Sequence, residues 1–253
     1  AGGLVAGVLG PQIVIWTRDI VPGAAFAGSF FAQATLALLS IPIVSALRAP
    51  PVSQAPPRAG RPLREIARQP RFIVAVSTGL VSYGLMSFVM TAAPVAMVGC
   101  GHSVETAAYG ISLHILAMFG PSFFTGRLID RFGKERITAA GLIMIAAAAI
   151  VNLSGLSVAQ FWIGLVLLGV GWNFGFIGAT ALVTDCYRPE ERAKVQALND
   201  FMVFGSVALA SLSAGKLLVL GGWEILNWLV FVPVIAATVL LLWQWRRDRT
   251  ETA

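Results

Sequence analysis

The sequence predicts an all-α polytopic membrane protein with eight transmembrane helices. Of 253 residues, only 12% are charged, whereas soluble domains average about 25%. Hydrophobic residues make up 57% of the chain, and they gather in long runs without the ten-residue alternation of barrel strands. A soluble enzyme would need more polar surface, and a disordered chain would need far less hydrophobicity. The composition therefore excludes both of these classes.

A membrane-spanning helix needs about 20 mostly apolar residues. Eight stretches of the sequence fit: 2–17, 22–47, 72–98, 106–126, 137–153, 158–183, 197–219 and 225–245. The first stretch is short, and the chain opens with Ala1-Gly2-Gly3, without Met or a basic leader. We therefore expect this sequence to be a fragment that continues from a longer chain.

The segment 48–71 separates the first two stretches from the other six. It contains five prolines before Arg64, and proline prevents helix propagation and favours an extended linker. We expect four parts: two helices in 1–47, a linker in 48–71, six helices in 72–245 and a tail in 246–253.

The basic residues predict how the helices are oriented. Residues 48–71, 127–136 and 185–194 and the tail contain 16 of the 18 basic residues, and only Arg18 and Lys216 lie elsewhere. The positive-inside rule places these four regions, and both ends of the chain, in the cytoplasm. Topology thus explains the net charge of +6, and no nucleic-acid partner is expected.

Residues 126–136 read GRLIDRFGKER. They resemble the G-x-L-x-D-R-x-G-R-R loop of the major facilitator superfamily of transporters. The positions that fit are Gly126, Leu128, Asp130, Arg131, Gly133, Lys134 and Arg136. Glu135 departs from the pattern, because a basic residue is common there. The alternative interpretation is a merely solvated basic loop between two spans.

The resemblance implies a twelve-helix fold in two six-helix halves, with this loop between helices 2 and 3 and again between helices 8 and 9. Two helices separate the linker from the motif, so the chain matches helices 5 to 12. Residues 1–47 are then the last two helices of the N-terminal half, and 72–245 form the C-terminal half. Residues 188–194 resemble the loop between helices 10 and 11.

The family implies secondary active transport of a small organic solute by alternating access, coupled to protons, in a monomer of the inner (plasma) membrane. Residues 7–11 resemble the Gly-Pro core of an antiporter motif, which favours export, although Val14 and Ile15 depart from it and a simple proline kink is the alternative. The rivals are an uptake permease, an inactive truncated product and a membrane-embedded enzyme. No P-loop, zinc spacing or nucleophile elbow occurs, so neither cofactor nor metal is expected.

Polar and aromatic residues deep in the spans are candidates for the substrate cavity, because polar groups are costly in lipid unless they face partners or water. The candidates are Tyr83, His114, Trp172, Asn173 and Phe176. His114 is suited to proton coupling because imidazole titrates near neutral pH; the alternative is a neutral histidine bonded to a neighbouring helix. Trp172 and Phe176 are expected to line the cavity, with core packing as the alternative.

A second set of residues is expected to form a charge network that opens and closes at the cytoplasmic surface. Its members are Gly126, Asp130, Arg131, Gly133, Lys134, Arg136, Asp185, Arg192 and Asp200. Asp200 lies near the cytoplasmic start of the seventh stretch, where it is expected to pair with loop arginines or to move protons. The alternative for Asp200 is plain electrostatics at a helix N-terminus.

Overall fold

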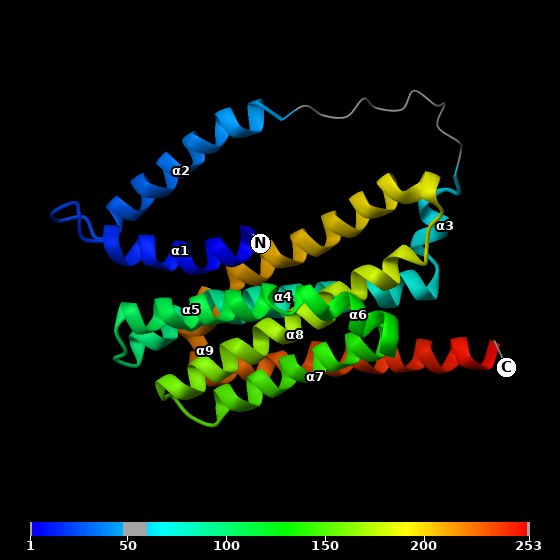
Figure 1. Cartoon of the computed structure of the whole chain (residues 1–253). Helices are drawn as coiled ribbons and strands as arrows, with labels where there is room; N and C mark the ends of the chain where they lie inside the picture. The colour runs from blue at the N-terminus through cyan, green and yellow to red at the C-terminus, as the bar shows by residue number, and fades with distance from the viewer. Residues whose placement is uncertain (1, 48–59, 252–253) are drawn as a thin grey trace.

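The computed structural model describes residues 2–47 and 60–251, and these ranges are helical with short connections and no strand (Figure 1). Residues 48–59 of the predicted linker and residues 252–253 of the predicted tail lie outside the described residues. The prediction of an all-α polytopic membrane fold is confirmed. Several helices are long and apolar enough to cross a membrane.

The first two helices are α1 (Gly2–Thr17) and α2 (Ala27–Ser45). Helix α2 begins five residues later than its predicted stretch because residues 18–26 form turns, with Phe26 at φ 66°. At the same end of the molecule, Arg18 pairs with Asp19 and with Glu105 at the start of α5, both at 2.8 Å. The charge of Arg18 is therefore balanced by two carboxylates.

The predicted stretch 106–126 is divided into two helices. After the short α3 (Leu63–Ala67) and the long α4 (Pro70–Gly99) come α5 (Val104–Phe119) and α6 (Ser122–Phe132). Helices α5 and α6 meet at Gly120-Pro121 with a bend of 42°. Proline lacks a backbone N–H and clashes with the preceding turn, which explains the break.

The expectation of a basic loop over 126–136 is wrong in its local structure. Residues 126–132 belong to α6, and α7 (Lys134–Leu153) begins directly after Gly133, at φ 90° and ψ 152°. Gly126 does not interrupt α6, which continues to Phe132 and ends where Gly133 takes a positive φ that other residues rarely adopt. The connection is thus a single residue.

The last two predicted spans both lie in one long helix, α9, which has a break between them. Helix α8 (Val158–Thr184) starts with a capping box of Ser157 and Gln160, and the 3₁₀ turn η1 (Pro189–Glu191) leads into α9 (Arg192–Glu251). Helix α9 is broken at Gly222, with φ 70° and ψ −178°, so that it supplies two spans. It also continues past the predicted span end at 245, so residues 246–251 are helical. The described helices thus account for each of the eight predicted stretches.

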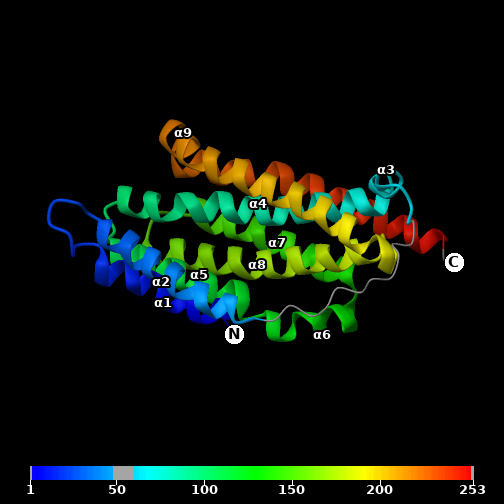
Figure 2. The ribbon, with the colours of Figure 1, turned by 90° about the horizontal axis from the view of Figure 1, so that it is seen from above.

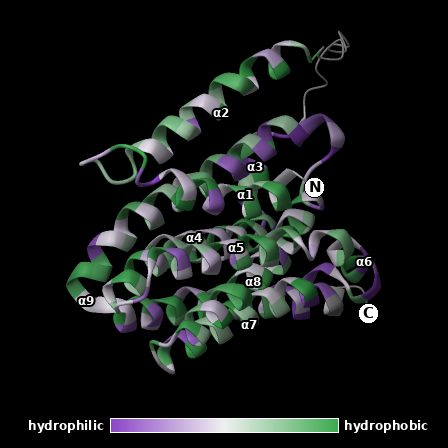
Figure 3. Cartoon of the chain, turned by 60° about the vertical axis from the view of Figure 1, so that its left-hand side comes forward, coloured by the Kyte–Doolittle hydropathy of each residue, from purple (hydrophilic) through white to green (hydrophobic). Residues whose placement is uncertain are grey.

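Helix α8 packs against α4, α5 and α7, while α9 packs along α4 and α7 (Figure 2). Helix α1 lies beside α5, and α2 diverges from the bundle in Figure 1. Hydrophobic residues cover the lengths of the helices, and hydrophilic residues gather at their ends, notably around α3 and α6 (Figure 3). This is the distribution that a bilayer requires.

Glycines allow α7 and α8 to approach closely. A Cβ atom on Gly141 would lie 2.1 Å from the backbone nitrogen of Gly175 and 2.7 Å from the carbonyl oxygen of Gly171. Small residues commonly permit such backbone contact in membrane helices. Since the obstacle is backbone, a side chain on Gly141 cannot be accommodated by a rotamer change.

Replacing Gly141 with Val is therefore expected to destabilise the protein by at least ~2 kcal/mol through overpacking. Thermal unfolding of the purified protein in detergent measures this. Gly215→Val is the matched control, because nothing lies within 4 Å of a Cβ on Gly215. Equal unfolding temperatures for the two variants would contradict the close α7–α8 contact.

Candidate functional site

Five aromatic side chains from four helices meet in one cluster, which we call the aromatic platform: Tyr83 of α4, Phe119 of α5, Trp172 and Phe176 of α8, and Phe204 of α9. The rings of Trp172 and Phe176 are stacked, with centroids 5.4 Å apart and an interplanar angle of 16°. Tyr83 meets these two rings edge-on, at 5.2 Å and 5.0 Å. Stacked and edge-to-face pairs of this kind are the favoured aromatic geometries.

The helical repeat builds the centre of the platform, because Trp172 and Phe176 are four residues apart and share one face of α8. Trp172 is only 7% exposed, whereas Phe204 is 55% exposed. The platform is therefore anchored in the core and open at one side within the described part of the chain. Tyr83, Trp172 and Phe176 were candidates from the sequence. Phe119 and Phe204 were missed, because no pattern in α5 or α9 marks them.

His114 is fully buried between α5 and α8. Its Nδ1 lies 2.7 Å from the carbonyl oxygen of Leu165. A carbonyl oxygen only accepts, so Nδ1 carries the hydrogen and Nε2 of the neutral ring is a bare acceptor. Nε2 is buried and has no hydrogen-bond partner among the described residues.

Asn173 lies at the bend between α5 and α6 rather than in the platform. It is fully buried, and its Nδ2 donates to the carbonyl oxygen of Met118 at 2.6 Å and to Ser122 Oγ at 2.7 Å. Thr125 Oγ1 shares its hydrogen between Asn173 Oδ1 at 2.6 Å and the carbonyl oxygen of Pro121 at 2.8 Å. Both ends of the amide are thus occupied within the protein.

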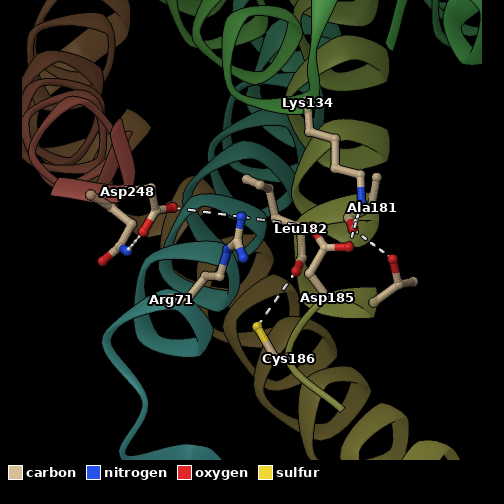
Figure 4. A network of polar contacts seen from close by, with 9 residues as sticks. Arg71, Lys134, Ala181, Leu182, Asp185, Cys186 and Asp248 are labelled. Carbon is tan, nitrogen blue, oxygen red and sulfur yellow. Dashed lines mark hydrogen bonds and ion pairs between the residues drawn. The ribbon is translucent and has the colours of Figure 1, made fainter. Parts of the chain in front are cut away.

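A charge network joins four helix ends at one end of the bundle (Figure 4). Lys134 Nζ lies 2.6 Å from Asp185 Oδ1 and donates to the carbonyl oxygen of Ala181 at 3.1 Å. Arg71 Nη2 lies 4.0 Å from Asp185 Oδ2 and 3.5 Å from Asp248 Oδ2. The starts of α4 and α7 are thereby tied to the ends of α8 and α9.

The structure brings together only Lys134 and Asp185 of the predicted gating residues. Five others lie exposed on α6, α7 and α9 and form no ion pair with another described residue: Asp130, Arg131, Arg136, Arg192 and Asp200. The guanidinium groups of Arg131 and Arg136 lie over the rings of Phe132 and Trp245, at 5.2 Å and 5.7 Å. Gly126 is exposed on α6, and Gly133 makes the turn into α7. Sequence reasoning missed Arg71 and Asp248, which come from distant parts of the chain.

A second ion pair attaches the end of the linker to η1. Arg61 donates to Glu191 from its backbone nitrogen at 2.8 Å, from Nε at 2.9 Å and from Nη2 at 2.7 Å. Glu191 also accepts from the backbone nitrogen of Arg188 at 2.9 Å, and Lys194 donates to the carbonyl oxygen of Arg61. The side chain of Glu191 is fully buried. Sequence reasoning missed this pair too, since 130 residues separate its members.

Hydrogen bonds from the Arg61 guanidinium and from the backbone N–H of Arg188 hold the pKa of Glu191 well below its ordinary value of 4.5. The pKa of Arg61 is raised in turn, mainly by its hydrogen bond to Glu191. A carboxylate that accepts several charge-assisted and backbone hydrogen bonds favours its ionised form. This pair is therefore ionised across the physiological pH range.

A cavity of about 660 Å³ lies between α1, α2, α4 and α5. Its walls are apolar apart from Gln33, and none of the five cavity candidates from the sequence lines it. Within residues 2–47 and 60–251, no three His, Cys, Asp or Glu side chains are grouped so that they could hold a metal ion. The platform and the charge network are thus the two chemically distinctive regions of the described chain.

Comparison with known proteins finds a family model and several relatives. Residues 77–253 match the family model described as Major Facilitator Superfamily. The riboflavin transporter RfnT of Brucella anthropi is 61% identical over 244 residues, which cover 95% of this chain and 61% of that protein. The uncharacterized MFS-type transporter YddS of Bacillus subtilis is 34% identical over 165 residues, covering 64% of this chain and 38% of that protein. The drug efflux pump JefA of Mycobacterium tuberculosis is 32% identical over 140 residues, covering 54% and 27% of the two chains. The chain thus spans less than two thirds of the length of each of these relatives.

The buried pair of Arg61 and Glu191 generates a test of stability against pH. A carboxyl group whose pKa is lowered by folding stabilises the protein at pH above its ordinary value of 4.5, and this contribution is lost as the pH falls further. We expect Glu191→Gln to lower the thermal midpoint of the protein by several degrees at pH 7. The difference from the unchanged protein should stay constant from pH 7 down to about 5, and it should shrink only as the pH is lowered below the ordinary value of 4.5.

Glu190→Gln is the matched control, because the neighbouring Glu190 is exposed. Its midpoint should follow that of the unchanged protein at every pH. A Glu191→Gln midpoint that shows no difference at pH 7, or a difference that grows on acidification, would contradict the assigned role of the pair.

Proposed function

The chain belongs to the major facilitator superfamily, and from that premise we propose that the protein containing it carries riboflavin, or a flavin of similar shape, across the membrane by alternating access. In such transporters two halves rock about a site near the midplane, so that the site opens to one side at a time. The similarity to the riboflavin transporter of Brucella anthropi, over 95% of this chain, supports the choice of solute.

The aromatic platform is the observation that carries the proposal. The ring system of riboflavin is flat, heteroaromatic and wide, so it binds best where aromatic side chains offer a flat face. Trp172 and Phe176 are stacked on each other with Tyr83 edge-on beside them, and a planar solute would extend this stack by displacing Phe119 from Trp172. The open side next to Phe204 gives a planar ligand a route to these rings.

Proton coupling is the second part of the proposal, and it rests on His114. A buried imidazole with a bare Nε2 acceptor can take up a proton when a conformational change brings in water or a donor. His114 also lies on α5, which supplies Phe119 to the platform. Protonation of this ring would therefore act on a helix that is in contact with the solute.

The cytoplasmic charge network is proposed to act as the gate. The pair of Lys134 and Asp185 joins the start of α7 to the end of α8, and both side chains are about one-third exposed. Because both side chains reach water, each charge can be hydrated when the pair separates, so opening it leaves no buried charge without a partner. The exposed Asp130, Arg131, Arg136, Arg192 and Asp200 are proposed to form their pairs in another state of the cycle.

The protein is an integral membrane protein. We propose that it resides as a monomer in the inner (plasma) membrane, with the linker and the end of α9 in the cytoplasm, because the basic residues gather on that face. Export, favoured by the Gly-Pro pattern at residues 7–11, and uptake are the two directions to be distinguished. A membrane-embedded enzyme is disfavoured, because the relatives named above are transporters or pumps.

Removal of the indole ring of Trp172 tests the platform. We expect Trp172→Ala to weaken riboflavin binding about 10- to 100-fold, since stacking on one aromatic ring is worth ~1–3 kcal/mol in comparable systems. Quenching of riboflavin fluorescence by the purified full-length protein measures the affinity. Trp228→Ala is the matched control, because Trp228 is 58% exposed and contacts Phe231 instead. An equal loss in both variants would contradict a specific site at the platform.

Transport driven by a pH gradient in vesicles tests the coupling. We expect His114→Ala to abolish accumulation of riboflavin against its gradient while riboflavin exchange continues, and Asp200→Asn to reduce it. His102→Ala serves as the control, because His102 bonds to Leu156 at a helix connection. Proton dependence that is unchanged in both variants would remove His114 and Asp200 from the coupling. Accumulation in the acidic compartment indicates antiport, and accumulation in the alkaline compartment indicates symport.

A further inference from the structure

Helix α6 is attached to the rest of the described bundle through very few buried groups. Thr125 is its only buried residue, whereas Phe123 and Phe124 are 68% and 46% exposed. In Figure 2 this helix lies at the edge of the bundle. Its far end leads through Gly133 to Lys134, which pairs with Asp185. Helix α6 is thus a short helix whose polar contacts with the rest of the described bundle lie near its two ends.

The side chain of Asn173 forms hydrogen bonds with the N-terminal turn of α6. Because Pro121 has no N–H, the backbone ladder cannot continue unbroken from α5 into α6. Asn173 donates to Met118 of α5 and to Ser122 of α6, and it accepts from Thr125 of α6. One amide therefore bonds to both sides of the 42° bend.

The same bend also touches the aromatic platform. Phe119 directly follows Met118 on α5, and Trp172 directly precedes Asn173 on α8. The rings of Phe119 and Trp172 are 5.9 Å apart. Met118 and Phe119 of α5 thus contact Asn173 and Trp172 of α8, one pair by a hydrogen bond and the other through aromatic rings. A movement of the α5 backbone at Phe119 therefore also moves the carbonyl oxygen to which Asn173 donates.

We propose that Asn173 is a positioning residue that couples occupancy of the aromatic platform to the angle between α5 and α6. A planar solute that stacks on Trp172 displaces Phe119 and, with it, the neighbouring Met118 of α5. The angle between α5 and α6 then changes, and α6 rotates about its hydrogen bonds to the amide of Asn173. The far end of α6 then moves Lys134 relative to Asp185. This inference rests on the proposed function, and it assigns Asn173 to the conformational change and not to contact with the solute.

Two substitutions in the full-length protein test the coupling. Asn173→Leu removes all three bonds at similar volume, and Thr125→Val removes only the hydroxyl at the start of α6. Both are expected to lower riboflavin turnover in vesicles by about tenfold while the dissociation constant for riboflavin changes less than about threefold. If Asn173→Leu does not fold, Thr125→Val alone decides. Asn152→Leu is the matched control, since Asn152 is also buried and donates to Asn227 at 2.9 Å away from the bend. Its turnover should stay normal.

Spin labels report the bend directly. Phe123→Cys on α6 and Ile163→Cys on α8 are exposed sites, and the exposed Cys100 is replaced by Ser. Riboflavin should shift the distance between the labels in the otherwise unchanged protein, and the shift should be lost with Thr125→Val or Asn173→Leu. Normal turnover, or equal losses of turnover and affinity, would overturn the proposal.

Failure of the proposed function gives a different result. If the unchanged protein binds no riboflavin, that function is wrong, and the label distance without ligand still tests Asn173. A broader distribution of label distances in Asn173→Leu than in the unchanged protein supports the role of Asn173 in positioning α6. Identical distance distributions in the two proteins overturn that role.

Discussion

Inside a bilayer every backbone N–H and C=O needs a partner within the protein, and this constraint governs the structure. It explains why the described chain is helical and why, wherever a helix is interrupted, specific residues allow the break or satisfy the freed backbone groups. Gly133 and Gly222 break the helices with a single residue at positive φ. The Pro121 bend lies deeper and uses the amide of Asn173. Buried hydroxyl groups meet the same requirement through carbonyl oxygens of their own helix, at Thr78, Thr125 and Thr138.

Two kinds of ion pair hold together the end of the bundle at which α4, α7 and α9 begin, and they differ in how easily they separate. The Lys134–Asp185 pair is partly hydrated, so water readily replaces each partner when the two separate. Glu191, in contrast, is enclosed and accepts several hydrogen bonds, so separation from Arg61 would leave a buried charge without compensation. The first attachment can therefore open at low cost, whereas the second holds Arg61 of the linker firmly to η1, just before α9.

The sequence predicted the features that depend on local pattern. The helical class and the approximate extents of the spans follow from hydropathy, and the aromatic residues expected at mid-span include three members of the platform. The division of the chain at the linker stays a prediction. The single-residue turn at Gly133 was mistaken for a longer loop, because basic residues at the end of a helix resemble basic residues in a loop. The partners of distant residues could not be predicted. Nothing in the spacing of Arg61 and Glu191, or of Phe119 and Trp172, encodes that they touch.

The double pairing of Arg18 has a consequence for how the protein responds to the electric field across the membrane. A lone cation at a membrane surface is driven by the transmembrane potential toward the negative side, at about 2.3 kcal/mol per charge for 100 mV. Asp19 and Glu105 both lie 2.8 Å from this guanidinium group, and they leave the cluster with no net positive charge. The contact between α1 and α5 therefore carries no unbalanced cation on which the voltage can act.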